Sequence, residues 1–357
     1  MWDIVDGNYD VQKLVVEDGF FNIITHKDGS INLENALATE EDAPEEEEPM
    51  DIHLKNIELR NLDIHKLDES SMLDVETFIY WADGGFQTGG GEIAAHIDTE
   101  FELNIIDDGD TTFIKHKHFE FHTDLIFNEE TGFLSFKPSG ITMEHGDFEL
   151  EGSLDTKNDM TIDLAVRGTK PNFDILIAFA PEDLIPVLER YKNAGKIYFN
   201  AVVQGPTANE QMPFIDAEFG ASEAFLENTG ANQRLEEMGF KGHFTNGEER
   251  NMQTMEFSLT DITAKPEKGI FKGNIYVTNF EEPDVKMDLH ADFDLQFLAE
   301  FFNLSDIRDA HGRVQLDMNF HDIIDLDHPE RALSEINQAY AAEFRVQNLR
   351  LRSPDLS

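Results

Sequence analysis

Residues 285–295 read VKMDLHADFDL, and apolar residues occupy every second position: Val285, Met287, Leu289, Ala291, Phe293 and Leu295. Successive side chains of a β-strand point to opposite faces of the sheet, so this alternation predicts a strand with one apolar face and one wet face. Antiparallel sheets that expose one face to water have this pattern. The stretch therefore predicts one-sided β-sheet.

The same period of two extends over most of the chain. Phe119, Phe121 and Phe127 alternate with polar residues, and Leu164 and Val166 do the same farther along. The pattern predicts about fifteen strands, more than one flat sheet usually holds. We therefore expect a mainly β fold: an elongated, curled antiparallel sheet that forms a groove, with two or three short helices against it.

A second feature is the duplication of residues 141–199 as residues 262–316. Repetition of one supersecondary unit indicates an elongated array rather than a closed catalytic globule. The spacing drifts between matched segments, as expected if loops vary while strands are kept. The matched segments are Ile141-Thr142 with Ile262-Thr263, Leu150–Leu154 with Phe271–Ile275, Asp163-Leu164 with Asp288-Leu289, and Gly195–Phe199 with Gly312–Leu316.

Short helices are expected to interrupt the strands. Residues 181–191 begin with Pro181-Glu182-Asp183, which suits a helix N-terminus, and residues 294–303 carry apolar residues at helical spacing. These two helices occupy the same place in the two repeats. A third is expected at roughly 329–341. Each is placed to cover part of the apolar face of the sheet.

The N-terminal region is predicted as β-hairpins and an acidic loop. Glu17-Asp18-Gly19 and Lys27-Asp28-Gly29 are turn signals between apolar runs. Residues 39–50 are rich in Glu and Asp, and we expect a solvated loop that can be deleted without loss of stability; an acidic cation-binding tail is the alternative. The expected segments are the hairpin segment 1–38, the loop 39–50, a sheet segment 51–140, the first repeat 141–255 and a second, truncated repeat 256–357.

Composition narrows the function further. The chain of 357 residues has a formal net charge of −46, which argues against nucleic acid and against anionic lipid headgroups as partners. It has 29 Phe, which suits dry surfaces, and no Cys, which excludes a thiolate nucleophile or a zinc–thiolate site. No apolar run approaches the ~18–20 residues of a membrane span. Because strand-like patterning begins and ends abruptly at the two termini, we interpret the chain as a fragment.

The most metal-like cluster is His116, His118, Glu120 and His122, which share one face of a predicted strand. Two imidazoles and a carboxylate could ligate Zn²⁺ or Ni²⁺. Neighbours on one face of a strand lie ~7 Å apart, however, so three in a row diverge. Without ligands from a neighbouring strand the site stays open. The three histidines are therefore weak metal candidates, and a solvated polar face is the preferred interpretation.

Catalytic motifs are weak throughout the sequence. Asp107-Asp108-Gly109-Asp110 lacks the later acidic positions of a calcium loop, and the glycines at 84–85 and 89–91 lack the Lys-Ser/Thr of a phosphate loop. No nucleophile elbow or Ser/His/Asp grouping is visible. We therefore expect no catalytic residues, no cofactor and no enzymatic activity.

Several segments resemble the AsmA family of Gram-negative envelope proteins, in particular its Bacteroidota members. The resemblance covers nearly the whole chain and is one of pattern rather than of invariant residues. It is carried by Trp2–Val5, the turn Lys27–Asn32, the Glu/Pro-rich insertion, the strand Ile52–Leu59, the duplicated Gly195 and Gly312 strands, and Leu349–Pro354.

The resemblance implies a periplasmic β-rich body tethered to the inner membrane by an N-terminal helix. We interpret the chain as a fragment without that anchor. The family is associated with outer-membrane assembly and is similar to bridge-like lipid-transfer proteins, whose curled sheet holds acyl chains. The resemblance thus implies phospholipid acyl chains as ligands and envelope proteins as further partners. It implies the inner membrane as a neighbour through missing segments, with the outer membrane as a second candidate.

Pattern and resemblance together predict an apolar β-groove that holds lipid tails. The candidate lining residues are Phe119, Phe121, Phe127, Leu164, Val166, Met287, Leu289 and Phe293. Two alternatives stay open at this point. In the first alternative, the fold is an ordinary β-sandwich whose Phe residues fill a closed core. In the second, the protein is a scaffold that recruits assembly factors through exposed sheet edges without binding lipid.

Overall fold

The computed structural model describes residues 9–32, 52–54, 56–70, 72–107, 110–111, 114–180, 185–208, 211–303, 308–323 and 341–352. It is mainly β, with 69% of residues in strands, and its mixed sheet is not closed. The predicted fold class of a curled sheet with few helices is confirmed. The chain divides into two compact units, which meet in the sequence between Thr161 and Ile162; Ala178–Glu182 and Ala208–Glu210 also belong to the first unit.

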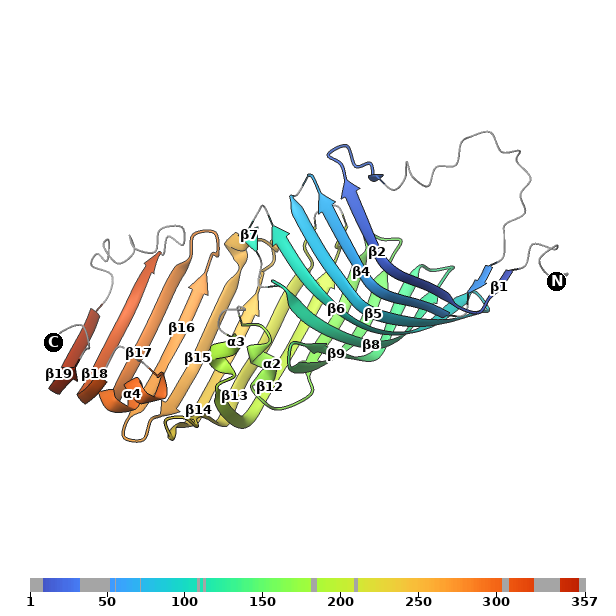
Figure 1. Ribbon diagram of the computed structural model, residues 1–357. Helices are drawn as coiled ribbons and strands as arrows, with labels where there is room; N and C mark the ends of the chain where they lie inside the picture. Colours follow the sequence, from blue (N-terminus) through green and yellow to red (C-terminus); the bar gives the residue numbers. More distant parts are fainter. Residues whose placement is uncertain are drawn as a thin grey trace. The chain divides into compact units, whose positions relative to one another are not determined.

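The first unit is a sheet of long strands that bend along their length (Figure 1). Its strands pair in the order β2 (Leu14–Thr25), β4 (Asn56–Asp68), β5 (Leu73–Gly89), β6 (Glu92–Asp107), β8 (Lys117–Asn128), β9 (Phe133–Met143) and β10 (Gly146–Asp155). The short β7 (Asp110–Thr111) extends the edge of β6, and β1 (Tyr9–Val11) pairs with β3 (Ile52–Leu54).

One prediction about this unit is wrong in part, because the sheet is not wholly antiparallel. β2 runs parallel to β4, and β1 runs parallel to β3. Parallel neighbours need a long crossover, which here is the chain between Thr25 and Asn56. Residues 33–51, including the predicted acidic loop at 39–50, lie outside the described residues.

The first predicted turn, Glu17-Asp18-Gly19, is also wrong. β2 continues through it, and Asp18 instead takes a left-handed conformation opposite Asn61 of β4, which does the same. The Asn61 amide donates a hydrogen bond to Asp18 Oδ1 at 3.1 Å. Asp and Asn tolerate positive φ, so the Asp-Gly signal marks an irregularity inside a strand rather than a hairpin. The second turn, Lys27-Asp28-Gly29, is present, with Thr25 bridged to Ile31.

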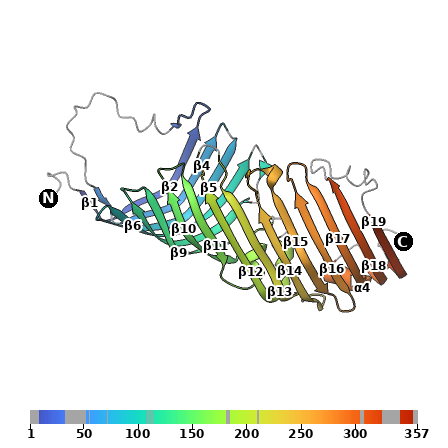
Figure 2. The same ribbon diagram turned by 180° about the vertical axis from the view of Figure 1, so that it is seen from behind.

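The second unit is an antiparallel sheet whose strands pair in chain order. They are β11 (Thr161–Gly168), β12 (Tyr191–Gly205), β13 (Phe214–Asn228), β14 (Gln233–Thr245), β15 (Glu256–Lys265), β16 (Ile270–Thr278), β17 (Asp284–Asp294), β18 (Arg308–Ile323) and β19 (Ala341–Arg352). Figure 2 shows β12 to β17 from the side opposite to that of Figure 1. A 3-10 turn, η1 (Met252–Thr254), precedes β15.

The described residues of the second unit form three short helices: α2 (Asp174–Ile177), α3 (Ile185–Leu188) and α4 (Leu295–Phe301). The helix predicted at 294–303 is confirmed by α4. The helix predicted at 181–191 ends earlier than expected, at Leu188, because Tyr191 already begins β12. Residues 181–184 lie outside the described range. α2 was not predicted. The helix expected at 329–341 falls almost wholly on residues 324–340, which the structure does not describe.

The two matched stretches have the same order of elements. Three strands, a helical segment and a fourth strand follow one another as β9, β10, β11, α2–α3, β12 and again as β15, β16, β17, α4, β18. The duplicated Gly195 and Gly312 both sit at a register shift in the fourth strand. The pairing registers differ, since Ile141 faces Phe148 whereas its counterpart Ile262 faces Gly273.

Candidate functional site

The strand registers place the apolar residues of the second unit on one face of its sheet. Residues directly opposite each other in a pair of strands project to the same face. One such row crosses seven strands and contains only apolar residues: Val166, Ala201, Ala217, Phe244, Phe257, Val277 and Val285. Alternation along β11 and β17 adds Leu164, Met287, Leu289 and Phe293 to the same face. We call this the second apolar face.

The first unit has an equivalent surface. A row of paired residues runs through Leu62, Ile79, Phe101, Phe119 and Met143, and the Phe101 and Phe119 rings stack at 5.2 Å. Phe121 and Phe127 lie two and eight residues along β8 on the same side. We call this the first apolar face. The structure thus groups three of the predicted lining residues on one unit and five on the other.

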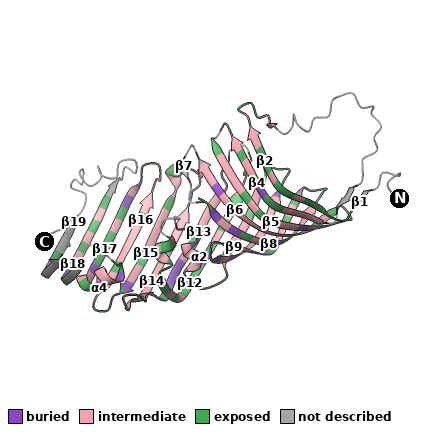
Figure 3. Cartoon of the chain, viewed as in Figure 1, coloured by how far each residue is buried: buried purple, intermediate pink, exposed green. Residues whose placement is uncertain are grey.

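Most of these side chains are only half-buried. Of the eight predicted lining residues, only Phe119 is buried, with 8% of its surface exposed, and the other seven are intermediate. A second layer of sheet, as in a sandwich, would bury them fully. Figure 3 shows the same along the strands, where intermediate and exposed residues far outnumber buried ones.

Helices cover only parts of the second apolar face. Ile175 of α2 is fully buried, and its side chain lies 2.8 Å from the position that a Cβ on Gly168 would take. α4 starts where β17 ends, and the Phe301 carbonyl at its other end accepts hydrogen bonds from Tyr191 and Asn228, at 3.0 and 2.8 Å. α4 therefore spans from β17 toward the ends of β12 and β13. Buried residues under or within these helices include Ile175, Phe297 and Phe301.

A strap formed by residues 178–180 covers part of the first apolar face. Phe179 packs edge-on against Phe148, with ring centroids 5.7 Å apart, and the Lys117 ammonium donates to the Ala180 carbonyl at 2.7 Å. Lys117 is 1% exposed, on the face otherwise lined by Phe119 and Phe121. Burial of an ammonium requires such hydrogen bonding. The strap thus covers this face beside Lys117 and Phe148.

The opposite face of both sheets is charged and wet. On the second unit, Arg313 makes a two-pronged contact with Asp292, at 2.6 and 2.8 Å, and Lys241 pairs with Asp261 at 2.8 Å. The hydrogen bond from Arg313 lowers the pKa of Asp292 below its ordinary value. Exposed pairs of this kind contribute little stability each. They mark the face that meets water.

The three predicted histidines do not converge. His116 contacts Glu102 at 2.8 Å, His118 contacts Glu100 at 3.4 Å, and His122 contacts Asp98. His116 precedes β8 and has a φ of 48°, so the prediction that it shares the strand face is wrong. Each of the three histidines contacts a different carboxylate of β6.

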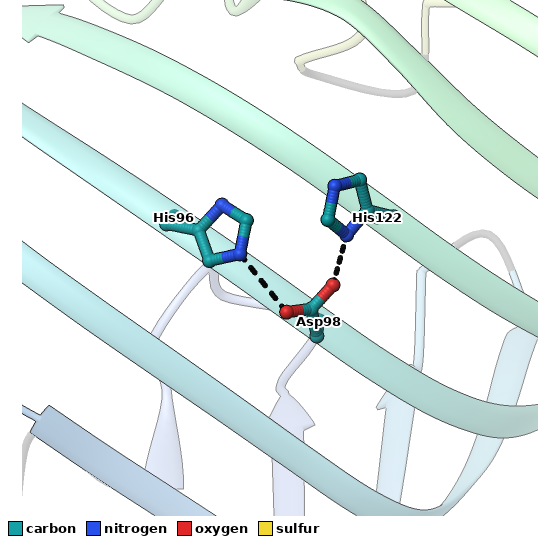
Figure 4. Close-up of side chains that lie close together, drawn as sticks. All are labelled: His96, Asp98 and His122. Atoms are coloured by element: carbon teal, nitrogen blue, oxygen red, sulfur yellow. Dashed lines mark hydrogen bonds and ion pairs between the residues drawn. The ribbon is translucent and has the colours of Figure 1, made fainter.

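A second imidazole, that of His96 on β6, lies beside His122, and the sequence analysis did not predict it. His96 Nε2 lies 3.0 Å from one oxygen of Asp98, and His122 Nδ1 contacts the other oxygen (Figure 4). His96 Nδ1 is held by Asp124 at 2.8 Å. The hydrogen bond to Asp124 is the main reason why the pKa of His96 is raised above its ordinary value. We call His96, Asp98 and His122 the histidine cluster.

A second group of potential metal ligands lies on the same wet face, nearer β4. His65 contacts Asp74 at 2.5 Å, and Glu76 lies close by and accepts a hydrogen bond from the Asn104 amide at 2.8 Å. Only one imidazole takes part. This group is more buried than the histidine cluster but offers a weaker set of ligands for a transition metal.

Among the described helices, none is long and apolar enough to cross a membrane. No protein-family model, curated protein or solved structure matches this chain. The resemblance to the AsmA family therefore stays a prediction.

Proposed function

We propose that the two apolar faces bind lipid acyl chains, and that the protein contributes without enzymatic activity to phospholipid transport and outer-membrane assembly in the cell envelope. The observation that carries the proposal is the half-buried state of the predicted lining residues. Leu289 and Met287 lie on the face that carries the apolar row across seven strands, yet neither is buried. Monomeric soluble proteins rarely leave a continuous apolar surface larger than a few hundred Å² without a partner.

The energetics suit acyl chains as that partner. Each methylene transferred from water to an apolar surface contributes about 0.8 kcal/mol, so one lipid tail lying along several strands gains many such increments. Phe and Leu side chains supply such a surface without polar groups that would need hydrogen bonds. The lining of the second apolar face thus fits a ligand that is long, flexible and without polar atoms.

The charge distribution supports binding through tails rather than headgroups. The net charge of −46 repels anionic headgroups, and the charged pairs lie on the wet face of the strands. Tails lying on the apolar face would leave a headgroup free to project into water. A periplasmic location with an inner-membrane tether is part of the same proposal, and it rests on the family resemblance alone.

A scaffold role is the second candidate, and β2 is the observation that favours it. Leu14, Val15, Phe20 and Phe21 of this strand are each more than 40% exposed. Exposed apolar strands near a sheet edge can pair with a strand of another chain. This role predicts binding to envelope proteins that persists when lipid is stripped away.

Native mass spectrometry of the purified chain tests the proposal. We expect adducts with the mass of phospholipid on the wild type and on Tyr276→Asp, because Tyr276 lies on the wet face, 40% exposed. Leu289→Asp should carry fewer adducts, because it places a carboxylate on the second apolar face and leaves the first apolar face unchanged. Wild-type protein free of lipid, or equal adducts on the two variants, would contradict the proposal.

A further inference from the structure

We propose that the histidine cluster is a binding site for a divalent transition metal, Zn²⁺ by preference. It lies on the wet face of β6 and β8, opposite the first apolar face, so the inference does not depend on lipid binding. The cluster combines two imidazoles with one carboxylate, a set of donors that suits Zn²⁺ better than Mg²⁺ or Ca²⁺.

The geometry brings the donors from two strands to one point. His96 and Asp98 alternate along β6, and His122 comes from β8 in direct register with Asp98. One donor atom from each of the three lies within 4.8 Å of the others. A tetrahedral Zn²⁺ with bonds near 2.1 Å needs donors about 3.4 Å apart. Small rotations of exposed side chains cover the difference, because His96 and His122 are exposed on a fixed strand backbone.

A hydrogen bond to Asp124 orients the His96 ring for metal binding. Its Nδ1–H is held by Asp124, which leaves Nε2 as the atom that faces Asp98 and His122. Histidines that bind metals through one ring nitrogen usually donate the other to a carboxylate, which fixes the ring and increases its basicity. Zn²⁺ would replace the proton that His96 Nε2 shares with Asp98, and the hydrogen bond to Asp124 would be kept.

The local charge also favours a cation. Asp83 of β5 is paired in register with Asp98, and Glu100 follows two residues along β6. The site would link β6 to β8 by metal bonds in place of a shared proton. Three protein ligands leave a fourth position for water or for an exogenous donor.

Isothermal titration of the full-length chain with ZnCl₂, in buffer free of chelators, tests the site. The wild type should take up one equivalent with higher affinity than the diffuse binding expected of an acidic surface. Asp98→Asn and His122→Gln should each weaken that equivalent at least tenfold. Asp124→Asn should weaken it about 10- to 100-fold through the orientation of His96. Ca²⁺ in excess should not displace the Zn²⁺.

Two further variants keep the result interpretable. His243→Gln is the matched control. His243 pairs with Asp216 at 2.8 Å across two strands, but it belongs to neither group of potential metal ligands among the described residues. It should bind Zn²⁺ like the wild type. Zn²⁺ binding unchanged in His122→Gln would overturn the proposal. Loss of the tight equivalent only in His65→Gln would also overturn it, because the metal would then lie at His65, Asp74 and Glu76.

Discussion

At the scale of single residues, glycine marks where strands depart from regular pairing. Gly195 and Gly312 occupy corresponding places in the two matched stretches, and each lies at a register shift. Gly312 has a φ of 132°, which an L-residue with a side chain rarely adopts. At Gly195 the constraint is space, since a Cβ would come within 2.5 Å of the Ala224 Cβ. Two different physical causes thus select the same residue.

Gly195→Ala is therefore expected to destabilise the second unit. The added methyl would meet Ala224, and overpacking of this kind typically costs about 1–3 kcal/mol. Gly85→Ala is the matched control, because a Cβ there meets nothing within 4 Å. Urea denaturation followed by circular dichroism measures both. Equal midpoints for Gly195→Ala and the wild type would disprove the steric account.

His96 is expected to make stability depend on pH. Asp124 raises the pKa of His96 above the ordinary value of 6.5, so the protonated ring stabilises the fold below that value. This contribution is lost as the pH rises through the raised pKa. Asp124→Asn should lower the pKa of His96 and should cost more stability at pH 5.5 than at pH 8.5. The titration of the His96 ring proton by NMR gives the pKa directly; an unchanged midpoint in Asp124→Asn would refute the assignment.

At the scale of elements, α4 is the part of the second unit that packs most like a closed core. Asp294 caps the helix by accepting from the Gln296 amide at 2.8 Å. Phe297 and Phe301 stack at 5.4 Å, and Phe301 also contacts the Tyr191 ring at 5.0 Å. The helix thus ties the end of β17 to the start of β12.

The second unit should unfold at a lower urea concentration in Phe301→Ala than in Phe302→Ala. Phe301 is 2% exposed and Phe302 is 54% exposed, although the two are neighbours in the chain. Truncation of a buried Phe typically costs about 3–5 kcal/mol, whereas an exposed one costs far less. Equilibrium unfolding in urea compares the two variants. Similar losses in both would mean that α4 does not pack on the sheet as described.

The predictions from sequence succeeded where one strand alone decides the answer. The alternation in β8, β11 and β17 is a property of each segment, so the sequence predicts which residues of each strand lie on its apolar side. The pairing register cannot be predicted in this way, because it also depends on the partner strand. For this reason His96 and Asp98 were missed, although His96-Ile97-Asp98 alternates and could have been noted as a second polar strand face. The parallel pairing of β2 with β4 was missed for the same reason.

The helices show a second limit of the sequence. α4 carries its own apolar stripe and a capping Asp294, and it was placed correctly. In the 181–191 segment, the charged Glu189 and Arg190 were assigned to a helix, but Tyr191 joins β12, where pairing with Asn228 outweighs helical spacing. Local pattern decides only where tertiary contacts agree with it.

At the scale of the whole molecule, the central feature is one-sidedness. Each unit has a sheet with an apolar face and a charged face, and the described helices and strap cover the apolar faces only in part. Seven of the eight predicted lining residues keep intermediate exposure. Full burial of these side chains would make the fold more stable. In the proposal, their remaining exposure is explained by ligand binding.

Site-specific photo-crosslinking tests this claim most directly. A photoreactive phenylalanine derivative is placed at Phe121, at Leu289 or at Tyr276, and the full chain is irradiated with phospholipid that carries labelled acyl chains. Phe121 and Leu289 lie on the first and the second apolar face. Tyr276 lies on the wet face of β16, opposite Lys286 of β17. The account predicts labelled adducts at Phe121 and Leu289 and none at Tyr276. Adducts at Tyr276 as abundant as at Leu289, or none at either apolar position, would contradict it.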